Sequence, residues 1–236
     1  MRKGMRINVN KSKVMWISKE DRQETEFNIE CEGQNLERVE SFKYLGTIIT
    51  SDGRVDQEVL NRVKKATSAY YQISNTIVGK KEITTKTKIQ IYNSIIKPII
   101  QYSTESLPLL DKHRSKLTAV EMKYLRRTVG NTRRDRIRND RIGEEVKLRK
   151  ALTEVINERQ LKWFGHVYRM GEERKVKQVM EMRVEGRKRR GRPRIKWEDT
   201  IERIGQQKGK TMVEMKRMCR DREKWMKWTE RGEPDA

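Results

Sequence analysis

The sequence predicts an α+β protein, with a small antiparallel sheet near the N-terminus followed by a mostly α-helical region. Two observations predict this division. Short β-prone runs separated by turn residues fill the first 50 positions. From Val55 onward, apolar residues recur every three or four positions, which is the period of a helix with one buried face. The chain has no fixed-period repeat that would indicate a solenoid.

The strands are expected in the first 50 residues. Phe27–Cys31 alternates apolar and polar side chains, and the turn signal at 32–35 makes the next run its hairpin partner. A sheet of this size cannot bury both faces alone, so the chain looks as though it begins partway through a domain. The predicted strands are Ile7–Val9, Val14–Ile17, Phe27–Cys31, Leu36–Val39 and Tyr44–Ile49, the last ending at a turn at 51–53.

The helices are expected from the apolar stripes that follow. The first stripe runs from Val55 to Ile77 and ends at Gly79. The second begins near Thr84, and Pro98 should kink or end it because proline removes a backbone donor. The remaining predicted helices are one through Leu117–Leu125 ending at Gly130, one over 148–169, a short one through Trp197–Ile204, and one that starts at the capping box Thr211–Glu214 and has Met215, Cys219 and Trp225 on one face.

The charge of the chain predicts a polyanionic partner. Its 236 residues contain 56 Lys and Arg against 34 Asp and Glu, a formal net charge of +22. Nucleic acid is the default partner for such a surface, because each phosphate neutralised releases condensed counterions. The alternative is a merely solvated surface. The excess lies towards the C-terminus: positions 121–150 carry 11 basic and 5 acidic residues, and positions 183–196 carry 8 basic residues and one acid.

Several classes of protein are excluded or disfavoured by composition. The longest aliphatic cluster, Ile95–Ile100, is broken by Lys97 and Pro98, so no membrane span is expected. No apolar run follows the first three residues, so no secretory signal is expected either. Cys31 and Cys219 make no disulfide framework, and with only two histidines the chain lacks the ligands for a structural zinc site. We therefore expect a nuclear or cytoplasmic protein.

Six ordered segments resemble the C-terminal part of the endonuclease–reverse transcriptase of non-LTR (LINE-type) retrotransposons. Each segment is weak alone, but six in the right order are specific. They are Met5–Ile17, similar to the last palm motif with Ile7, Asn8, Lys11, Ser12 and Lys13 as its core; Phe42–Gly46, similar to the "FKYLG" of the primer grip; the helices of Val55–Tyr102, similar to the thumb; Gly165–Met170, similar to "GHVxRM"; Gly191–Arg194 with Trp197, similar to "GRPxxxW"; and Arg220–Trp225, similar to "DRxxW".

The resemblance implies five regions. They are a palm remnant with the primer-grip hairpin (1–52), a helical thumb (53–110), a helical basic connection (111–184), a basic Gly/Pro linker (185–196) and C-terminal helices (197–236). One departure lies at Tyr102–Ser106, which keeps the Tyr and Glu of the family's "YGxExW" but loses its Gly and Trp.

The resemblance implies a Mg²⁺-dependent polymerase as the parent enzyme. Its two metal ions are held by clustered carboxylates from earlier palm motifs, including an Asp-Asp pair. This chain contains no Asp-Asp dipeptide. We therefore expect the chain alone to bind no cofactor and to be inactive as a polymerase. Its expected partners are RNA and DNA, including the template–primer and the retrotransposon RNA, and the missing N-terminal polymerase portion.

The resemblance also assigns candidate nucleic-acid contacts. Lys11 or Lys13 occupies the position of a palm Lys near the incoming nucleotide, although a solvated strand-end Lys is the simpler interpretation. Lys43, Tyr44 and Gly46 would position the primer terminus; the alternative is a core strand with Tyr44 inward. The thumb helices would direct a set of lysines to the template–primer backbone, any of which is otherwise a solvated charge: Lys64, Lys65, Lys80, Lys81, Lys86 and Lys88.

The most distinctive short motif is a run of basic residues around a Gly-Arg-Pro core. It resembles an AT-hook, whose extended Arg-Gly-Arg fits a narrow A·T minor groove. The same residues fit a nuclear-localisation signal, or a flexible basic linker with non-specific phosphate affinity. A non-enzymatic DNA-binding accessory protein and an inert remnant of a decayed element therefore remain alternative functions. The residues are Arg187, Lys188, Arg189, Arg190, Gly191, Arg192, Pro193 and Arg194.

Three further features are expected to be structural. His166 has no acidic residue or cysteine within three positions, so a packed or capping histidine is favoured over a ligand or catalyst. Cys31 and Cys219 have no partner in sequence and are expected to be inert. The Met-rich face from Met212 to Met226 is more typical of a soft core or docking stripe than of a cofactor site.

Overall fold

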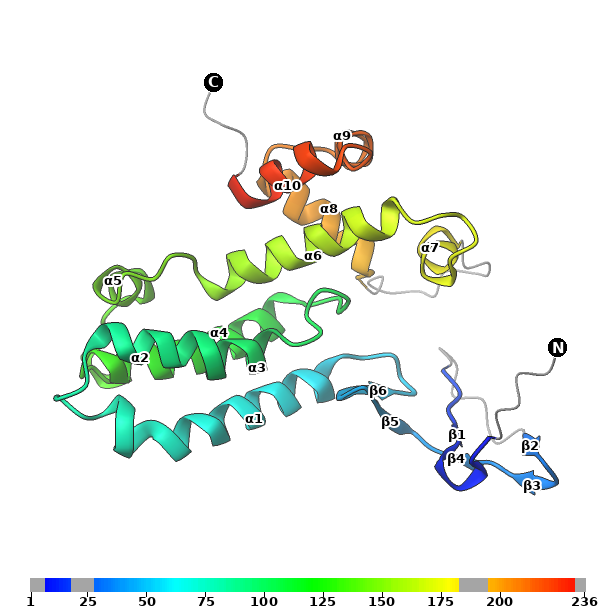
Figure 1. Cartoon of the computed structure of the whole chain (residues 1–236), viewed down its shortest axis with the longest axis horizontal. Helices are drawn as coiled ribbons and strands as arrows, with labels where there is room; N and C mark the ends of the chain where they lie inside the picture. The colour runs from blue at the N-terminus through cyan, green and yellow to red at the C-terminus, as the bar shows by residue number, and fades with distance from the viewer. Residues whose placement is uncertain (1–6, 18–27, 183–194, 232–236) are drawn as a thin grey trace. The chain divides into compact units, whose positions relative to one another are not determined.

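The computed structural model describes residues 7–17, 28–182 and 195–231 (Figure 1). The chain divides into two compact units, residues 1–61 and 62–236, and the boundary falls inside the first long helix. The first unit contains short strands, and the second is helical throughout the part that the structure describes. The predicted α+β class is confirmed.

The first unit contains three separate strand pairs rather than one antiparallel sheet. Strands β2 (Glu30–Cys31) and β3 (Gln34–Asn35) form a hairpin around a turn at 32–33, so the partner of the first strand lies earlier than the predicted Leu36–Val39. Strands β1 (Lys13–Val14) and β4 (Glu37–Arg38) pair in parallel, so the expectation of a single antiparallel sheet was wrong. The run Ile7–Val9 is not a strand either. A 3-10 helix, η1 (Val9–Lys11), begins there because the Asn8 side chain accepts a hydrogen bond from the Lys11 amide.

A tight hairpin replaces the predicted strand Tyr44–Ile49. Strand β5 (Ser41–Tyr44) pairs antiparallel with β6 (Thr47–Thr50). The two turn residues, Leu45 and Gly46, have φ of 47° and 87°, and such paired positive values match the twist of a two-residue hairpin. The Ile48 amide donates a hydrogen bond of 2.7 Å to Glu58 and so ties the hairpin to the helix that follows.

Helix α1 (Asp56–Ile73) begins after the predicted turn, in which the Asp52 carboxylate accepts from the Arg54 amide at 2.9 Å. Its buried apolar residues lie on the predicted stripe, with Val59, Ala66 and Tyr70 at most 8% exposed, and the charged Glu58 and Arg62 are buried beside them. A π-helical turn, η2 (Ser74–Val78), extends it to Gly79, where the sequence predicted the end.

The second predicted helix is made of three pieces. They are α2 (Thr85–Ile91), the π-helix η3 (Tyr92–Ile96) and α3 (Lys97–Gln101). Thr84 caps the first piece, since its hydroxyl accepts from the Thr87 amide. Pro98 lies in the first turn of α3, where its missing amide is not needed. The wider π turn before it lets the helical segment continue past the proline.

Helix α6 is the centre of the second unit. It packs against α4 on one side and against α8 and α10 on the other (Figure 1). Two short helices, α5 and α7, were not predicted, and the helix predicted from Thr211 through Trp225 is divided in two by a turn at 219–221. The helices after α3 are α4 (Asp111–Thr128), the 3-10 helix η4 (Arg133–Asp135), α5 (Asn139–Glu145), α6 (Leu152–Tyr168), α7 (Lys175–Glu181), α8 (Trp197–Gln207), α9 (Met212–Met218) and α10 (Arg222–Arg231).

An aromatic and sulfur-rich cluster holds the C-terminal helices on α6. Gly165 permits the closest contact, because a Cβ there would lie 2.1 Å from the indole nitrogen of Trp225. That nitrogen donates to the Leu161 carbonyl at 3.1 Å. The Thr211–Glu214 capping box starts α9 as predicted. The buried members of the cluster are Leu161, Phe164, Ile201, Ile204, Met215, Cys219, Trp225 and Trp228.

Candidate nucleic-acid interface

The exposed face of helix α4 is a basic stripe, defined as Lys112, Lys116, Lys123 and Arg127. These residues follow one another at helical spacing, and the exposed Ser115 and Ala119 lie between them. Of the acidic residues of the helix, Asp111 pairs with Arg203 at 2.8 Å and Glu121 is buried. Over 11 residues, Lys116 to Arg127 spans about 16 Å at about 1.5 Å per residue. One strand of a B-form duplex presents about five phosphates over that length.

An arginine loop continues the stripe beyond the end of α4. We define the arginine loop as residues 131–138; Arg133, Arg134, Arg136 and Arg138 are all exposed in it. Arg126 fixes the far end of the loop, since its guanidinium donates to the Ile137 carbonyl at 3.0 Å.

Its near end is set by a capping box in which Asp135 accepts from the Thr132 amide and hydroxyl, at 2.6 and 2.8 Å. These bonds lower the pKa of Asp135. The arginine side chains are therefore displayed on a defined backbone rather than used to hold it.

An exposed tyrosine lies beside the basic stripe. Tyr71 of α1 is 60% exposed, and its hydroxyl accepts a hydrogen bond of 2.6 Å from Lys123 Nζ. The same ammonium lies 4.2 Å from the centroid of the Tyr71 ring. The contact joins an aromatic surface of α1 to the cations of α4, a combination that suits nucleic acid because phosphate and base contact different groups.

The predicted lysines of the helical region differ in exposure. Lys64 and Lys65 are exposed on α1, as are Lys80, Lys81 and Lys86 further along. Lys88 is only 5% exposed, and its pKa is lowered by burial and by the nearby Arg127 guanidinium. Lys88 is therefore the least accessible to a phosphate of the predicted lysines of this region.

The structure places the predicted residues of the first unit on small surface elements. Lys11 is exposed in η1, and Lys13 is ion-paired with Glu37 across the β1–β4 pair. Lys43 is exposed on β5, and Tyr44 is 59% exposed, so the alternative of a core strand with Tyr44 inward was wrong. Gly46 lies in the hairpin turn, where its positive φ explains the residue type.

The basic motif falls outside the residues that the structure describes. This applies to Arg187, Lys188, Arg189, Arg190, Arg192 and Arg194, which lie in the range 183–194. The motif keeps the three interpretations that the sequence allowed.

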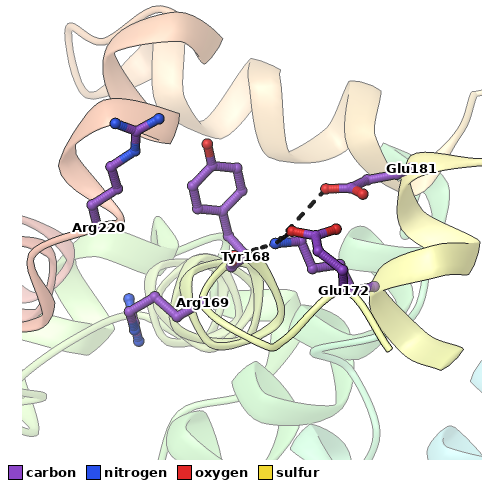
Figure 2. A pocket seen from close by; sticks show the side chains of 6 residues that line it. Tyr168, Arg169, Glu172, Glu181 and Arg220 are labelled. Atoms are coloured by element: carbon purple, nitrogen blue, oxygen red, sulfur yellow. Dashed lines mark hydrogen bonds and ion pairs between the residues drawn. The ribbon is translucent and has the colours of Figure 1, made fainter. Parts of the chain in front are cut away.

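An open pocket of about 600 Å³ lies between the end of α6, α7 and the turn that joins α9 to α10. Figure 2 shows two carboxylates on one side of Tyr168 and two guanidinium groups on the other. Lys177, only 8% exposed, pairs with Glu172 at 2.7 Å and lies 3.9 Å from Glu181. The pKa of Lys177 is raised by its hydrogen bond to Glu172.

Lys177 also donates to the Tyr168 and Met170 carbonyls at 3.2 Å, so it fastens α7 to the end of α6. Both carboxylates of the pocket are engaged in this clamp.

His166 and the cysteines lie in different surroundings, and His166 is not the packed residue that the sequence predicted. His166 is exposed in the last turn of α6, with its ring 5.5 Å from that of Trp163. Cys31 is half-buried and Cys219 is buried in the core cluster, where burial raises the pKa of its thiol to about 12. In the part of the chain that the structure describes, no group of three His, Cys, Asp or Glu side chains could hold a metal ion.

Sequence reasoning missed the residues that form this interface. The excess of basic residues over 121–150 was counted, but no individual residue of the basic stripe or the arginine loop was singled out. The signal for the stripe was present as cations at helical spacing. The exposure of Tyr71 had no sequence signal, because a neighbouring tyrosine, Tyr70, occupies the buried stripe of the same helix.

Comparisons with known proteins support an origin in a transposon. The chain is 24% identical over 233 residues to a Caenorhabditis elegans protein named as an uncharacterized transposon-derived protein, with 94% of this chain and 82% of that protein covered. No family model matches the chain. No solved structure matches it either. Among the described residues, no helix is long and apolar enough to cross a membrane.

Proposed function

We propose that the chain is a nucleic-acid-binding C-terminal fragment of a retrotransposon RNA-directed DNA polymerase, and that it holds the template–primer. The observation that carries the proposal is the basic stripe of α4 and its continuation in the arginine loop. The transposon-derived relative supports the transposon origin, and the resemblance of the ordered motifs is what suggests the parent enzyme. In this proposal, the cations contact phosphates and set the position of the strand without reading its sequence.

The ordered motifs support the proposal indirectly, since several of them meet in the second unit. Gly165 packs on Trp225, and the Trp197 indole donates to the Glu105 carbonyl at 2.9 Å. Arg159 pairs with the Glu105 carboxylate at 3.0 Å. These residues contribute to the packing of the helices. They hold α6 and the C-terminal helices together and fasten them to the segment that leads into α4, so their part in binding is to support the helix that carries the basic stripe.

The test of the proposal compares two triple variants of the full chain. Lys116→Gln, Lys123→Gln and Arg127→Gln together remove three charges from the basic stripe. The control, Lys216→Gln, Arg217→Gln and Arg222→Gln, removes the same charge from exposed positions on α9 and α10. Fluorescence anisotropy with a labelled RNA at moderate salt should show at least a tenfold loss for the stripe variant and less than a threefold loss for the control. Equal losses would mean that binding follows net charge and that the stripe is no interface.

We also propose that the fragment alone does not polymerise, because the paired carboxylates of the parent are missing from its sequence. Primer extension with Mg²⁺ tests this directly. We expect no incorporation by the purified chain, and any incorporation that survives repurification would refute the proposal.

Exposed apolar residues of the first unit support a further part of the proposal, that this unit contacts the remainder of the polymerase in the parent enzyme. Trp16, Ile17, Tyr44 and Leu45 are between 49% and 75% exposed. Trp16 and Ile17 are adjacent in the sequence, as are Tyr44 and Leu45, and exposed apolar patches mark protein–protein contact sites.

A further inference from the structure

Tyr71 is a large aromatic residue on an exposed face of α1, where the core of the protein does not need it. The buried stripe of α1 passes through Ala66 and Tyr70, and Tyr71 lies on the neighbouring face, 60% exposed. Lys64 and Ser68, at helical spacing before it, are exposed as well. A large aromatic side chain that is 60% exposed leaves ring surface accessible to a ligand.

The ring is nevertheless held in one place. Lys123 Nζ donates to its hydroxyl at 2.6 Å, and the Tyr70 ring lies 5.3 Å away, centroid to centroid, at an interplanar angle of 57°. Both contacts come from the protein itself, so the ring does not have to be ordered when a ligand binds. Preorganisation of this kind lowers the entropic cost of association.

The cations around the ring would bind the phosphate backbone of a nucleic acid on each side of it. Lys64 lies seven residues before Tyr71 on α1, and Arg127 lies one turn after Lys123 on α4. We propose that Tyr71 is a stacking platform for an unpaired base of a single-stranded nucleic acid whose phosphates lie on the basic stripe. This inference rests on the proposed function and specifies which form of nucleic acid the interface takes.

An aromatic platform discriminates between single strands and duplexes for a physical reason. The bases of a duplex are stacked on one another and are not available to a side chain on the protein surface. An unpaired base has a free face, and stacking it on an aromatic ring is favourable whatever the base. The basic stripe alone has no such preference, because phosphates are present in both forms.

The test compares Tyr71→Ala and Tyr71→Phe on an unpaired RNA and on a duplex of the same length, by fluorescence anisotropy. Tyr71→Ala should weaken binding of the unpaired RNA by about tenfold and binding of the duplex by less than twofold. Tyr71→Phe keeps the ring and should bind both within about twofold of the wild type. Tyr102→Ala, which truncates another tyrosine, 44% exposed, is the matched control and should leave both affinities unchanged.

Two outcomes would overturn the inference: no loss with Tyr71→Ala, or an equal loss on unpaired RNA and duplex. In either case the proposed function survives if the wild type still binds RNA and loses affinity steeply with salt. If the wild type binds neither form, both proposals fail. Cross-linking to RNA that contains 5-iodouridine provides an independent readout. We expect an adduct on Tyr71, and an adduct found on Tyr102 alone would count against the stacking platform.

Discussion

Glu121 is a buried carboxyl group at the junction of η3, α4 and α6. It is 1% exposed, and the Tyr92 hydroxyl donates to it at 2.6 Å. Burial raises its pKa, and hydrogen bonds from Tyr92 and the Leu152 backbone oppose that shift only partly. A carboxyl group whose pKa is higher in the folded state contributes most to stability below its unfolded pKa of about 4.5. That contribution is lost as the pH rises through the folded value.

We therefore expect the pH dependence of stability to change in Glu121→Gln. The amide cannot ionise, so the free energy of unfolding of the variant should rise relative to the wild type as the pH increases from about 5 to about 8. Urea denaturation followed by circular dichroism at several pH values measures this difference. Glu202→Gln, at an exposed position, is the control. A difference that stays constant over this range would show that Glu121 is ionised throughout.

Gly165 allows the close contact between α6 and Trp225. The variant Gly165→Ala adds a methyl group at this position and so tests that contact. Gly165→Ala would place a Cβ within 2.1 Å of the indole, so overpacking should cost about 1–3 kcal/mol of unfolding free energy. Gly143→Ala in α5 meets nothing within 4 Å and should be neutral or slightly stabilising. Thermal unfolding compares the two. A tolerated Gly165→Ala would mean that this helix contact is looser than the structure shows.

At the level of elements, Gln160 links three parts of the second unit. Its side chain accepts from Arg114 of α4 at 2.9 Å and donates to the carbonyls of Thr104 and Leu107 at 3.1 and 2.8 Å. Arg114 is 9% exposed, and burial lowers its pKa to about 10. These partners have little access to water, so they depend on Gln160.

Gln160→Leu should therefore be strongly destabilising. It keeps the size of the side chain but leaves a buried guanidinium nitrogen and two carbonyls without their partner, at a cost of at least about 2 kcal/mol. Chemical denaturation provides the measurement, with Gln206→Leu at an exposed position of α8 as the matched control. Similar stability of the two variants would contradict a structural role for the Gln160 network.

The long helices were predictable because the burial of one face produces an apolar stripe, and helix ends, short helices included, are marked by capping residues and glycines. The stripe through Val59 and Tyr70 and the capping box of α9 are examples. The β5–β6 hairpin was missed because Leu45 carries no turn signal, and its positive φ is imposed by the strand pairing around it. Short helices such as α7 were missed because seven residues give too little periodicity.

The candidate site was only partly predictable. Local charge density pointed to the region around α4, because Lys and Arg can be counted in a sequence. Which of these cations face solvent depends on tertiary packing, and Lys88 and Arg114 are buried while Lys116 and Arg133 are exposed. The pairing of Lys123 with Tyr71 joins residues 52 positions apart and has no local signal.

At the level of the whole molecule, the two units differ in what they leave exposed. Among its described residues, the first unit exposes large apolar side chains such as Phe42 and Leu45, at 37% and 75%. The second buries an aromatic cluster on α6 and displays basic side chains along α4 and the arginine loop. A polyanion bound to the basic surface of the second unit would compensate the net charge of +22.

The salt dependence of RNA binding tests the central claim most directly. If six to eight cations of the basic stripe and the arginine loop contact phosphates, the logarithm of the binding constant for a single strand should fall with the logarithm of salt concentration at a slope of about −4 to −6. Removing Lys116, Lys123 and Arg127 should make this slope less steep by about two. A wild-type affinity that does not change with salt, or a slope that the triple substitution leaves unchanged, would contradict the account.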